Sequence, residues 1–500
     1  MKNVFVLIIL LLSGFITCAN YDFNPNCINA YSAVTSLKFE KGQKLIDIEK
    51  RNNPHNNIPY YIESYIDFLK VAIGEKQSDF IRLKNNNKTR ISKLEKGDKS
   101  SPYYNYCLSE IYLQNAYSRI KFREYLSSAL EVNKAYRLLE KNHDLYPEFI
   151  PNYKNLGILH ALIGSIPDEY HWVAKMLNIK GSLSLGINEL NKVLRASIKN
   201  KNYEHLKGEA IYYKTFVVLF MQNEKKHVIN LYNLYETPSF SKLLNTNPML
   251  CYSKSSIALN LGLNNKAINI LLSKPKGDEY FQYDYLDYML GEAKLNRLDS
   301  DAKIYFIKYI SNFSGQNYIK ASYQKLAWCY LVSGDENKYK STISKVLKYG
   351  NSLFDVDKQA LVEAESGEVP NIYLLKSRLL FDGGYYNKSL KVLVEKKPSQ
   401  VYKKKKDAIE FTYRLARIYH KKENLNKAIS YYVMTLKNGK EYSYYYIANS
   451  SLQLGLIYED KSDYDKAKKY YKKCLSMNPE KYKNGIHNKA KAGINRIEKK

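Results

Sequence analysis

Histidine and cysteine are the residues of this chain that could hold a metal ion, and their spacing does not favour one. The chain has 8 histidines and 6 cysteines in 500 residues. No two histidines form an HxxxH pair, and no two cysteines form a CxxC pair. Zinc sites usually draw two ligands from one short motif, because a turn or one helix face then presents both together. The sequence therefore predicts no metal site.

The chain also lacks the short motifs that carry catalysis or hold a cofactor. There is no GxSxG, Walker A or GxGxxG motif. Gly383 and Gly384 lie between two predicted helices, which indicates a turn. Trp172 with Pro167 and Asp168 could line a pocket, although core and turn packing is the interpretation that we adopt. We therefore expect no enzyme, with no catalytic, cofactor-binding or metal-binding residues, and the substrate-binding residues stay unknown.

The chain is strongly basic and rich in tyrosine. Its formal net charge is +29, and it has 49 tyrosines against 2 tryptophans. Such a charge can attract nucleic acid or an anionic membrane. Most lysines are interleaved with Asp, Glu and Asn, as on a solvated helix face. Residues 462–500 are the exception, with 12 Lys or Arg against 4 Asp or Glu. We expect no nucleic-acid partner and keep peripheral membrane association as an alternative.

The first residues predict export. Lys2 precedes an uncharged apolar run at 4–12, and Thr17-Cys18-Ala19 then offers small residues to a signal peptidase. Cleavage after Ala19 is the main prediction, and the alternative is a lipid anchor at Cys18. We therefore place the protein in the periplasm or cell envelope. No later run reaches ~18 apolar residues, so we expect no spanning helix in the mature chain. The scattered cysteines do not form a disulfide framework.

A helix-pair pattern appears in LQLGLIYEDKSDYDKAKKYYKKCLSMNP, residues 452–479. Small residues, Gly455 on a first helix and Ala467 on a second, let two antiparallel helices approach closely, and tyrosines fill the space beside them. This order resembles the tetratricopeptide repeat of ~34 residues. The positions that carry the resemblance are Leu454, Gly455, Tyr458, Ala467, Tyr471, Leu475 and Pro479.

The same pattern recurs upstream, and roughly six helix pairs tile 250–480. Each pair has an apolar face that only a neighbouring pair can cover, so the pairs must stack. We therefore predict an all-α fold, an α-solenoid of stacked antiparallel helix pairs that forms a tetratricopeptide-like superhelix. The further matches are Leu415, Ala416, Tyr419, Ala428 and Tyr432; Leu326, Ala327, Tyr330 and Gly334; Leu380, Gly384, Tyr386 and Ser389; Leu290, Gly291, Ala302 and Phe306; and Gly262, Ala267 and Leu271.

Four segments are predicted along the chain. They are a signal peptide at 1–19, an irregular helical region with diverged repeats at 20–245, a helix-pair array at 246–480, and a basic C-terminal helix or tail at 481–500. Within the irregular region, residues 85–102 look the most flexible and residues 236–248 read as a loop. Residues 157–190 depart from the repeat, and the sequence assigns them no role.

The resemblance implies a concave groove, lined by first helices, that holds a peptide or a partner protein. The expected function is a non-enzymatic protein–protein interaction scaffold of the cell envelope, whose basic balance favours acidic segments. The alternative is a glycan-binding nutrient-uptake lipoprotein built on the same helix pairs. Such proteins usually carry a good lipid-attachment motif and sugar-stacking tryptophans, whereas this chain has Phe15-Ile16-Thr17 before Cys18 and only Trp172 and Trp328.

Overall fold

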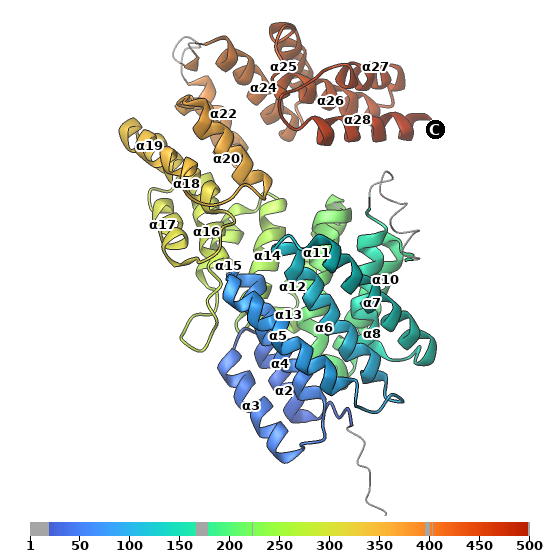
Figure 1. The fold of residues 1–500 in the computed structure, drawn as a ribbon. Coiled ribbons are helices and arrows are strands. Elements are labelled where there is room, and N and C mark those ends of the chain that lie inside the picture. The colour runs from blue at the N-terminus through green and yellow to red at the C-terminus, as the bar shows by residue number, and fades with distance from the viewer. Residues whose placement is uncertain (1–19, 167–178, 223, 396–400, 403, 499–500) are drawn as a thin grey trace, which may run out of the picture. The chain divides into compact units, whose positions relative to one another are not determined.

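The structure is a computed structural model, and it describes residues 20–166, 179–222, 224–395, 401–402 and 404–498 (Figure 1). Within these ranges the regular structure is helical, apart from one isolated bridge between Asn20 and Asn56. Successive helices form antiparallel pairs that stack on their neighbours. The predicted fold class, an α-solenoid of stacked helix pairs, is confirmed.

Two sequence hypotheses concern residues outside the described ranges. These are the leader at 1–19 with its alternative anchor Cys18, and the group formed by Pro167, Asp168 and Trp172. Within the described part of the chain, no helix combines the length and the hydrophobicity that crossing a bilayer requires.

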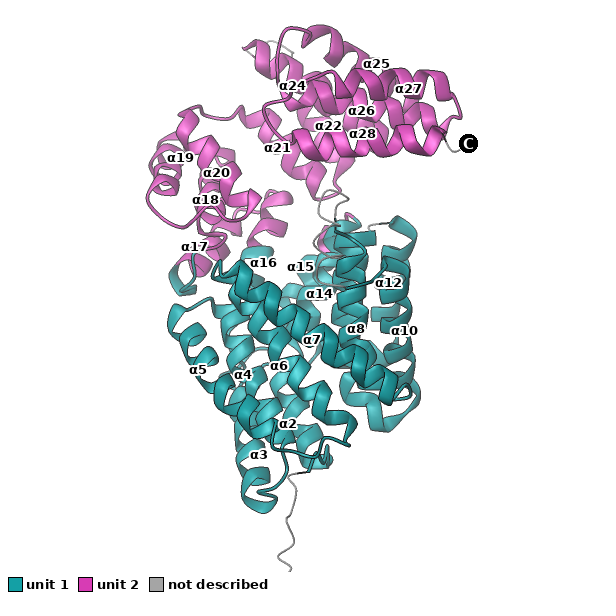
Figure 2. Cartoon of the chain, turned by 45° about the vertical axis from the view of Figure 1, so that its right-hand side comes forward, with its two compact units in different colours: residues 1–261, 266–289, 311–316 teal, residues 262–265, 290–310, 317–500 magenta. Residues whose placement is uncertain are grey.

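The chain divides into two compact units, which Figure 2 shows in teal and magenta. Unit 1 comprises residues 1–261, 266–289 and 311–316, and unit 2 comprises residues 262–265, 290–310 and 317–500. The helices that lie at the division are α15 (Asn264–Leu272), α16 (Tyr285–Asn296) and α17 (Ala302–Asn312).

Unit 1 is built largely from helix hairpins around one aromatic core. Its pairs are α2 with α3, α4 with α5, α6 with α7, and α8 with α10. Pair α6/α7 confirms the helices expected at 107–122 and 124–142, and its tight turn uses Arg123 in the left-handed region, at φ 65°. The bounds are α2 (Pro25–Thr35), α3 (Phe39–Asn52), α4 (Ile58–Gly74), α5 (Gln77–Leu94), α6 (Pro102–Lys121), α7 (Tyr125–Leu145), α8 (Ile150–Ile163), α10 (Leu183–Lys199), α11 (Lys207–Val217), α12 (Lys225–Glu236), α13 (Pro238–Leu244) and α14 (Pro248–Asn260).

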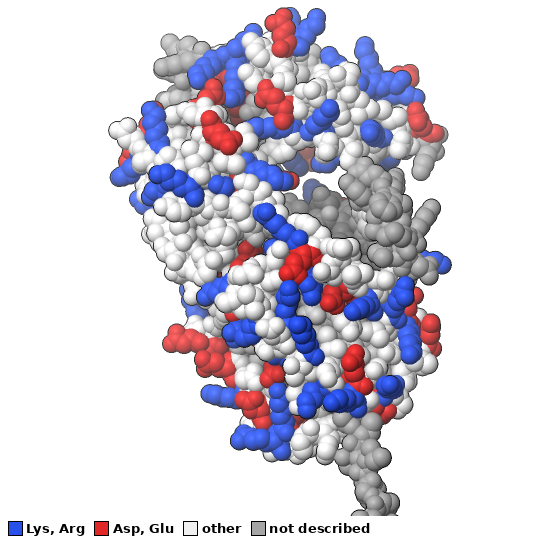
Figure 3. All heavy atoms as spheres, in the orientation of Figure 1, with Lys and Arg blue, Asp and Glu red and all other residues white. Residues whose placement is uncertain are grey.

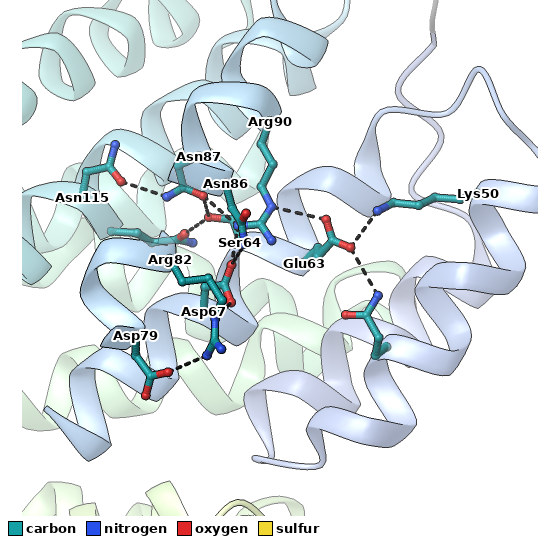
Figure 4. A network of polar contacts seen from close by, with 12 residues as sticks. Lys50, Glu63, Ser64, Asp67, Asp79, Arg82, Asn86, Asn87, Arg90 and Asn115 are labelled. Atoms are coloured by element: carbon teal, nitrogen blue, oxygen red, sulfur yellow. Dashed lines mark hydrogen bonds and ion pairs between the residues drawn. The ribbon is translucent and has the colours of Figure 1, made fainter. Parts of the chain in front are cut away.

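The prediction of a flexible segment at 85–102 is wrong for most of its length, because α5 extends to Leu94. Two of its polar residues, Asn87 and Arg90, are buried and hydrogen-bonded to neighbouring helices (Figure 4). The Arg90 guanidinium donates to Asp67 on α4 at 2.8 Å, and the Asn87 amide donates to Asn115 on α6 at 2.8 Å. A polar run therefore forms a packed helix, since each buried polar group finds a partner.

Residues 236–248 are also more ordered than predicted, because α13 occupies 238–244. Pro238 stands at the first helical position, where its missing N–H costs nothing. Phe240 is buried, with its ring 6.2 Å from the ring of Tyr235 on α12. One apolar anchor thus turns a segment rich in turn-forming residues into a short helix.

A lysine without solvent access lies at the centre of unit 1. Lys154 on α8 is fully buried, and its ammonium lies 2.6 Å from Glu110 on α6 and 3.0 Å from Glu209 on α11. It also donates to the hydroxyls of Tyr31 and Tyr65 at 3.2 and 3.1 Å. Burial lowers the pKa of Lys154 and raises the pKa of Glu209 to about 8. Glu209 therefore keeps a proton at pH 7, and Glu110 is the carboxylate that lies closest to the Lys154 ammonium.

Glycines explain part of the unusual sequence at 157–190. Helices α8 and α10 cross at Gly157 and Gly186, where a Cβ on Gly186 would collide with the Gly157 carbonyl oxygen and lie 2.6 Å from the amide nitrogen of Ala161. The glycines therefore permit a close helix crossing.

The described residues of unit 2 contain four helix pairs and two single helices, besides the parts of α15, α16 and α17 that belong to this unit. The pairs are α18 with α19, α21 with α22, α24 with α25, and α26 with α27. Single helix α20 packs on α18, and α28 packs on α26 and α27 at the end of the array. The bounds are α18 (Ile319–Val332), α19 (Glu336–Ile343), α20 (Asp355–Ser366), α21 (Ile372–Asp382), α22 (Tyr386–Val394), α24 (Lys405–Lys421), α25 (Leu425–Asn438), α26 (Tyr445–Asp460), α27 (Tyr464–Leu475) and α28 (Lys483–Glu498). The described chain also has three short non-α helical segments. They are η2 (Lys201–Leu206) and η3 (Val218–Gln222) in unit 1 and η4 (Ser344–Leu347) in unit 2.

The segment predicted as a basic helix or tail is a helix that covers the end of unit 2. Ile486, Ala490 and Gly493 of α28 are buried, and Gly493 lies directly against the ring of Tyr471. Its lysines point outward, as expected of a terminal capping element in a solenoid. On the face shown in Figure 3, Lys and Arg are interspersed with Asp and Glu over this unit.

Candidate binding groove

Three first helices of unit 2 end in the same turn. In each, a residue with φ between 60° and 92° follows the helix, and the next residue caps the second helix by accepting a hydrogen bond from a backbone N–H three positions on. A lysine of the second helix then lies over a tyrosine of the first. The left-handed residues are Gly334, Glu423 and Ser462; the caps are Asp335, Asn424 and Asp463; and the lysines are Lys338, Lys427 and Lys466.

Tyrosines hold the two helices of a pair together. The rings of Tyr458 and Tyr470 stack with centroids 5.6 Å apart, and those of Tyr419 and Tyr431 stack 5.7 Å apart, each with an interplanar angle of 3°. The space beside Gly455 is filled by a ring as well, because a Cβ there would lie 2.5 Å from Tyr471. Tyrosine thus supplies stacking area together with a hydroxyl that reaches polar groups.

One predicted repeat match is corrected in pair α21/α22. Leu380 was taken as its first-helix match, but the small residue that meets Ser389 is Ser377, with hydroxyl oxygens 2.9 Å apart. The signal was present in the sequence. Gly455 precedes Ala467 by 12 positions, and Ser377 precedes Ser389 by the same interval.

The first helices of unit 2 and the single helix α20 line a groove of about 750 Å³. Its walls come from α18, α20, α21, α24 and α26, with residues 481 and 482 at one end. The repeat explains this arrangement, because second helices stack behind the first helices and leave one face of each first helix free. Helix α20 contributes residues to the groove wall, and its presence between two pairs was not predicted.

Trp328 belongs to the structure of the groove wall and offers no open ring face. Its side chain is only 2% exposed, and its indole N–H donates to Glu363 at 2.8 Å. The Lys325 ammonium lies 4.0 Å from the ring centroid and the Arg378 guanidinium 5.2 Å from it. These cation–π contacts occupy the ring, so it is not available for stacking on a sugar.

Each carboxylate that lines the groove already has a hydrogen-bond or ion-pair partner among the described residues. Glu363 on α20 accepts from Gln324 at 2.7 Å and from the hydroxyl of Tyr339 at 3.0 Å, besides Trp328. Glu410 on α24 accepts from the Arg414 guanidinium at 2.7 Å. The remaining pairs are Glu368 with Lys406 at 2.7 Å, Asp407 with Asn371 at 3.2 Å, and Glu336 with Lys340 at 2.7 Å.

Two cations of the groove wall have only loose partners. The nearest carboxylate oxygen lies 3.7 Å from Arg378 and 4.0 Å from Lys325, and within the described chain neither cation makes a side-chain hydrogen bond. Their side chains are 33% and 13% exposed. Burial lowers the pKa of Lys325, because desolvation disfavours its charge.

The other residues singled out by sequence have structural roles. Gly384 has φ 80°, and its backbone lies against that of Gly262. Gly383 and Gly384 therefore form a turn between α21 and α22. Tyr445 and Tyr446 line the groove, and the Tyr446 hydroxyl donates to Glu410 at 2.7 Å. The Lys404 ammonium lies 3.8 Å from a carboxylate oxygen of Glu368.

The described cysteines are free and buried. Burial raises the pKa of Cys329 and of Cys474 to about 12, so both thiols stay protonated at neutral pH and behave as small apolar groups. Within the same residues no three His, Cys, Asp or Glu side chains converge to hold a metal ion.

Comparison with known proteins identifies part of the array. The tetratricopeptide repeat family matches residues 408–480, which span pairs α24/α25 and α26/α27. No curated protein matches the chain. Among solved structures it is similar to a chain in the crystal structure of the APC/C hetero-tetramer Cut9-Hcn1, with 12% sequence identity, a TM-score of 0.23 and coverage of 99% of each chain. The family match together with the recurring turn shows that the chain contains tetratricopeptide repeats.

Proposed function

We propose that this protein is a non-enzymatic interaction scaffold of the cell envelope that holds a partner protein or peptide in the groove of unit 2. The observation that carries the proposal is the groove itself. Tetratricopeptide first helices and α20 line it, and it has the volume of a typical ligand pocket. Fold alone does not define function, so the proposal rests on this surface.

The groove favours a peptide over a glycan. The tryptophan that a glycan site of this kind would use is not open in the groove, because Trp328 is covered by two cations. Valines of α20 and Pro370 supply apolar contact area, and Val362 is 43% exposed. This mixture of apolar area and polar groups suits a polypeptide segment.

Export is the second part of the proposal, and it rests on Lys2, the apolar run 4–12 and Thr17-Cys18-Ala19. N-terminal sequencing of the mature protein tests it. A start at Asn20 supports simple cleavage, a lipid-blocked Cys18 supports the anchored alternative, and an intact Met1 contradicts both.

Affinity capture from envelope extracts, followed by mass spectrometry, tests the groove. The wild-type chain is compared with Val362→Arg, which places a bulky charge in the groove, and with Val433→Arg on α25, where the valine is also 43% exposed but lies outside the groove. We expect Val362→Arg to lose the partner and Val433→Arg to keep it at moderate salt. Equal recovery by all three proteins would contradict the proposal.

A further inference from the structure

The groove is lined by equal numbers of acidic and basic side chains, but more of the acidic side chains have close partners. Five carboxylates and five cations line it. Each carboxylate has a hydrogen-bond or ion-pair partner within the described residues, as set out above. Lys404 and Lys406 both pair with Glu368. The fifth cation, Lys481, is exposed and has no ion pair within the described residues. Arg378 and Lys325 lie in the groove wall and have only the loose ion pairs given above, so the groove has spare donors for an anion.

Arg378 and Lys325 are held in place by the same ring. Lys325 comes from α18 and Arg378 from α21, and both lie over Trp328, which Glu363 fixes through its indole N–H. The guanidinium and the ammonium are therefore pre-positioned before a ligand arrives. Pre-positioned donors favour binding, because little side-chain freedom is lost when the ligand binds.

An apolar strip accompanies these cations in the groove. Val356 and Val362 on α20, with Val369 and Pro370 in the loop after it, line the groove and keep part of their surface exposed. A ligand that uses both features must present an anion and an aliphatic group together. Burial of the aliphatic group would also exclude water from the ion pair and strengthen it.

We propose that the groove binds a peptide segment in which a side-chain carboxylate contacts Arg378 and Lys325 while a neighbouring aliphatic side chain packs on the valines of α20. This inference rests on the proposed function and names its ligand chemistry. Arg378 can form a bidentate pair with a carboxylate, since its planar guanidinium offers parallel N–H donors. Lys325 adds a second charge from the neighbouring first helix.

The test uses the full chain and an array of synthetic peptides about 12 residues long, a length that can span several helices of the groove. All peptides carry amidated C-termini, so that only side chains supply carboxylates. Acidic, neutral and basic sets are compared, each with and without aliphatic residues. We expect the acidic-aliphatic set to bind best. Replacing its carboxylates by amides should weaken binding about 10-fold or more, because charge-assisted hydrogen bonds are lost.

Variants then locate the binding site by fluorescence anisotropy with the best peptide. Arg378→Gln and Lys325→Gln should each weaken binding about 10-fold, and Arg378→Lys should recover part of the loss because the charge remains. Lys391→Gln removes the same charge from an exposed position on α22 outside the groove, and it should change affinity by less than about twofold because solvent screens it.

The outcomes separate this inference from the proposed function. If neutral or basic peptides bind best and Val362→Arg abolishes their binding, the groove function stands and the carboxylate inference is wrong. If Lys391→Gln weakens binding as much as Arg378→Gln, the protein merely adsorbs anions and the inference is overturned. If no peptide set binds, the carboxylate inference is wrong, and the groove function then stands or fails on the capture experiment with Val362→Arg and Val433→Arg.

Discussion

Replacing Glu209 by glutamine should leave unit 1 almost as stable as the wild type at pH 7, whereas replacing Lys154 should not. Both residues lie in the same buried cluster, 3.0 Å apart. Burial raises the pKa of Glu209 to about 8, so the residue is largely protonated at pH 7 and glutamine imitates that form. Lys154→Met leaves Glu110 without its cation. Removing one partner of a buried ion pair typically costs about 3–5 kcal/mol.

The pH dependence of the free energy of unfolding gives the magnitude and the sign of the contribution of Glu209. The folded protein keeps a proton on Glu209 that the unfolded chain loses above its ordinary pKa of 4.5, so this group makes stability fall as the pH rises from about 4.5 to about 8. The slope approaches ~1.4 kcal/mol per pH unit within that window and vanishes above it. Glu209→Gln lacks this proton, so its stability relative to the wild type should rise over the same window.

Hydrogen exchange measured by mass spectrometry is the suitable assay, because a chain with two units need not unfold in one step. Amides of α8 and α11 report on the cluster, and amides of unit 2 serve as an internal reference. We expect loss of protection in α8 and α11 for Lys154→Met and near-wild-type protection for Glu209→Gln at pH 7. A loss of about 3 kcal/mol or more in Glu209→Gln would show that Glu209 is ionised, and would refute this reasoning.

Three further predictions concern packing and charge. Gly186→Ala should destabilise the α8/α10 crossing by about 1–3 kcal/mol through overpacking. The control Gly208→Ala should not destabilise α11, because its added carbon would lie 3.8 Å from its nearest neighbour, and thermal unfolding compares the two variants. Ala467→Leu places a larger group at a fully buried position and should lower the stability of its helix pair by about 1–3 kcal/mol. Protection from hydrogen exchange should be lost near the C-terminal end, and an even loss over residues 20–245 would contradict a stacked array. Replacing the exposed α28 residues Lys483, Lys489 and Lys491 by glutamine should slow association of a captured partner. The dissociation rate and the binding at ~0.5 M salt should stay nearly unchanged, whereas complete release at modest salt would point to adsorption.

The α28 experiment uses substitutions because the structure changes the expected result of a deletion. The sequence predicts that residues 480–500 are dispensable for salt-resistant binding. In the structure, however, α28 covers Tyr471, and its removal would expose the end of the array. Charge replacement separates the electrostatic contribution of this helix from its contribution to packing.

The solenoid could be predicted because its signals are local. Small residues 12 positions apart, such as Gly455 and Ala467, and tyrosines at fixed offsets define a helix pair before any tertiary contact is known. The helix at residues 77–94 was missed because its polar residues suggest solvent exposure, whereas Asn87 and Arg90 are buried by hydrogen bonds to other helices. Sequence reasoning weighs polarity, and it cannot identify a partner that lies on another helix.

The groove itself could be predicted only as a class of surface. Its position follows from the repeat, but α20 has no partner helix and no repeat signature to reveal it. The roles of its residues depend on three dimensions. Glu363 accepts from Trp328 on α18 and Tyr339 on α19, and Arg378 on α21 lies over the ring of the same Trp328. None of these contacts leaves a spacing pattern in the sequence.

Photo-crosslinking from inside the groove shows whether the groove holds a partner in the cell. A benzophenone amino acid is placed at Val362 in the groove or at Val433 on α25, two positions with the same 43% exposure, in the full chain expressed in its own cells. We expect a discrete crosslinked partner from position 362 that is absent from position 433. Crosslinks of equal yield from both positions, or from position 433 alone, would contradict a groove that holds a partner.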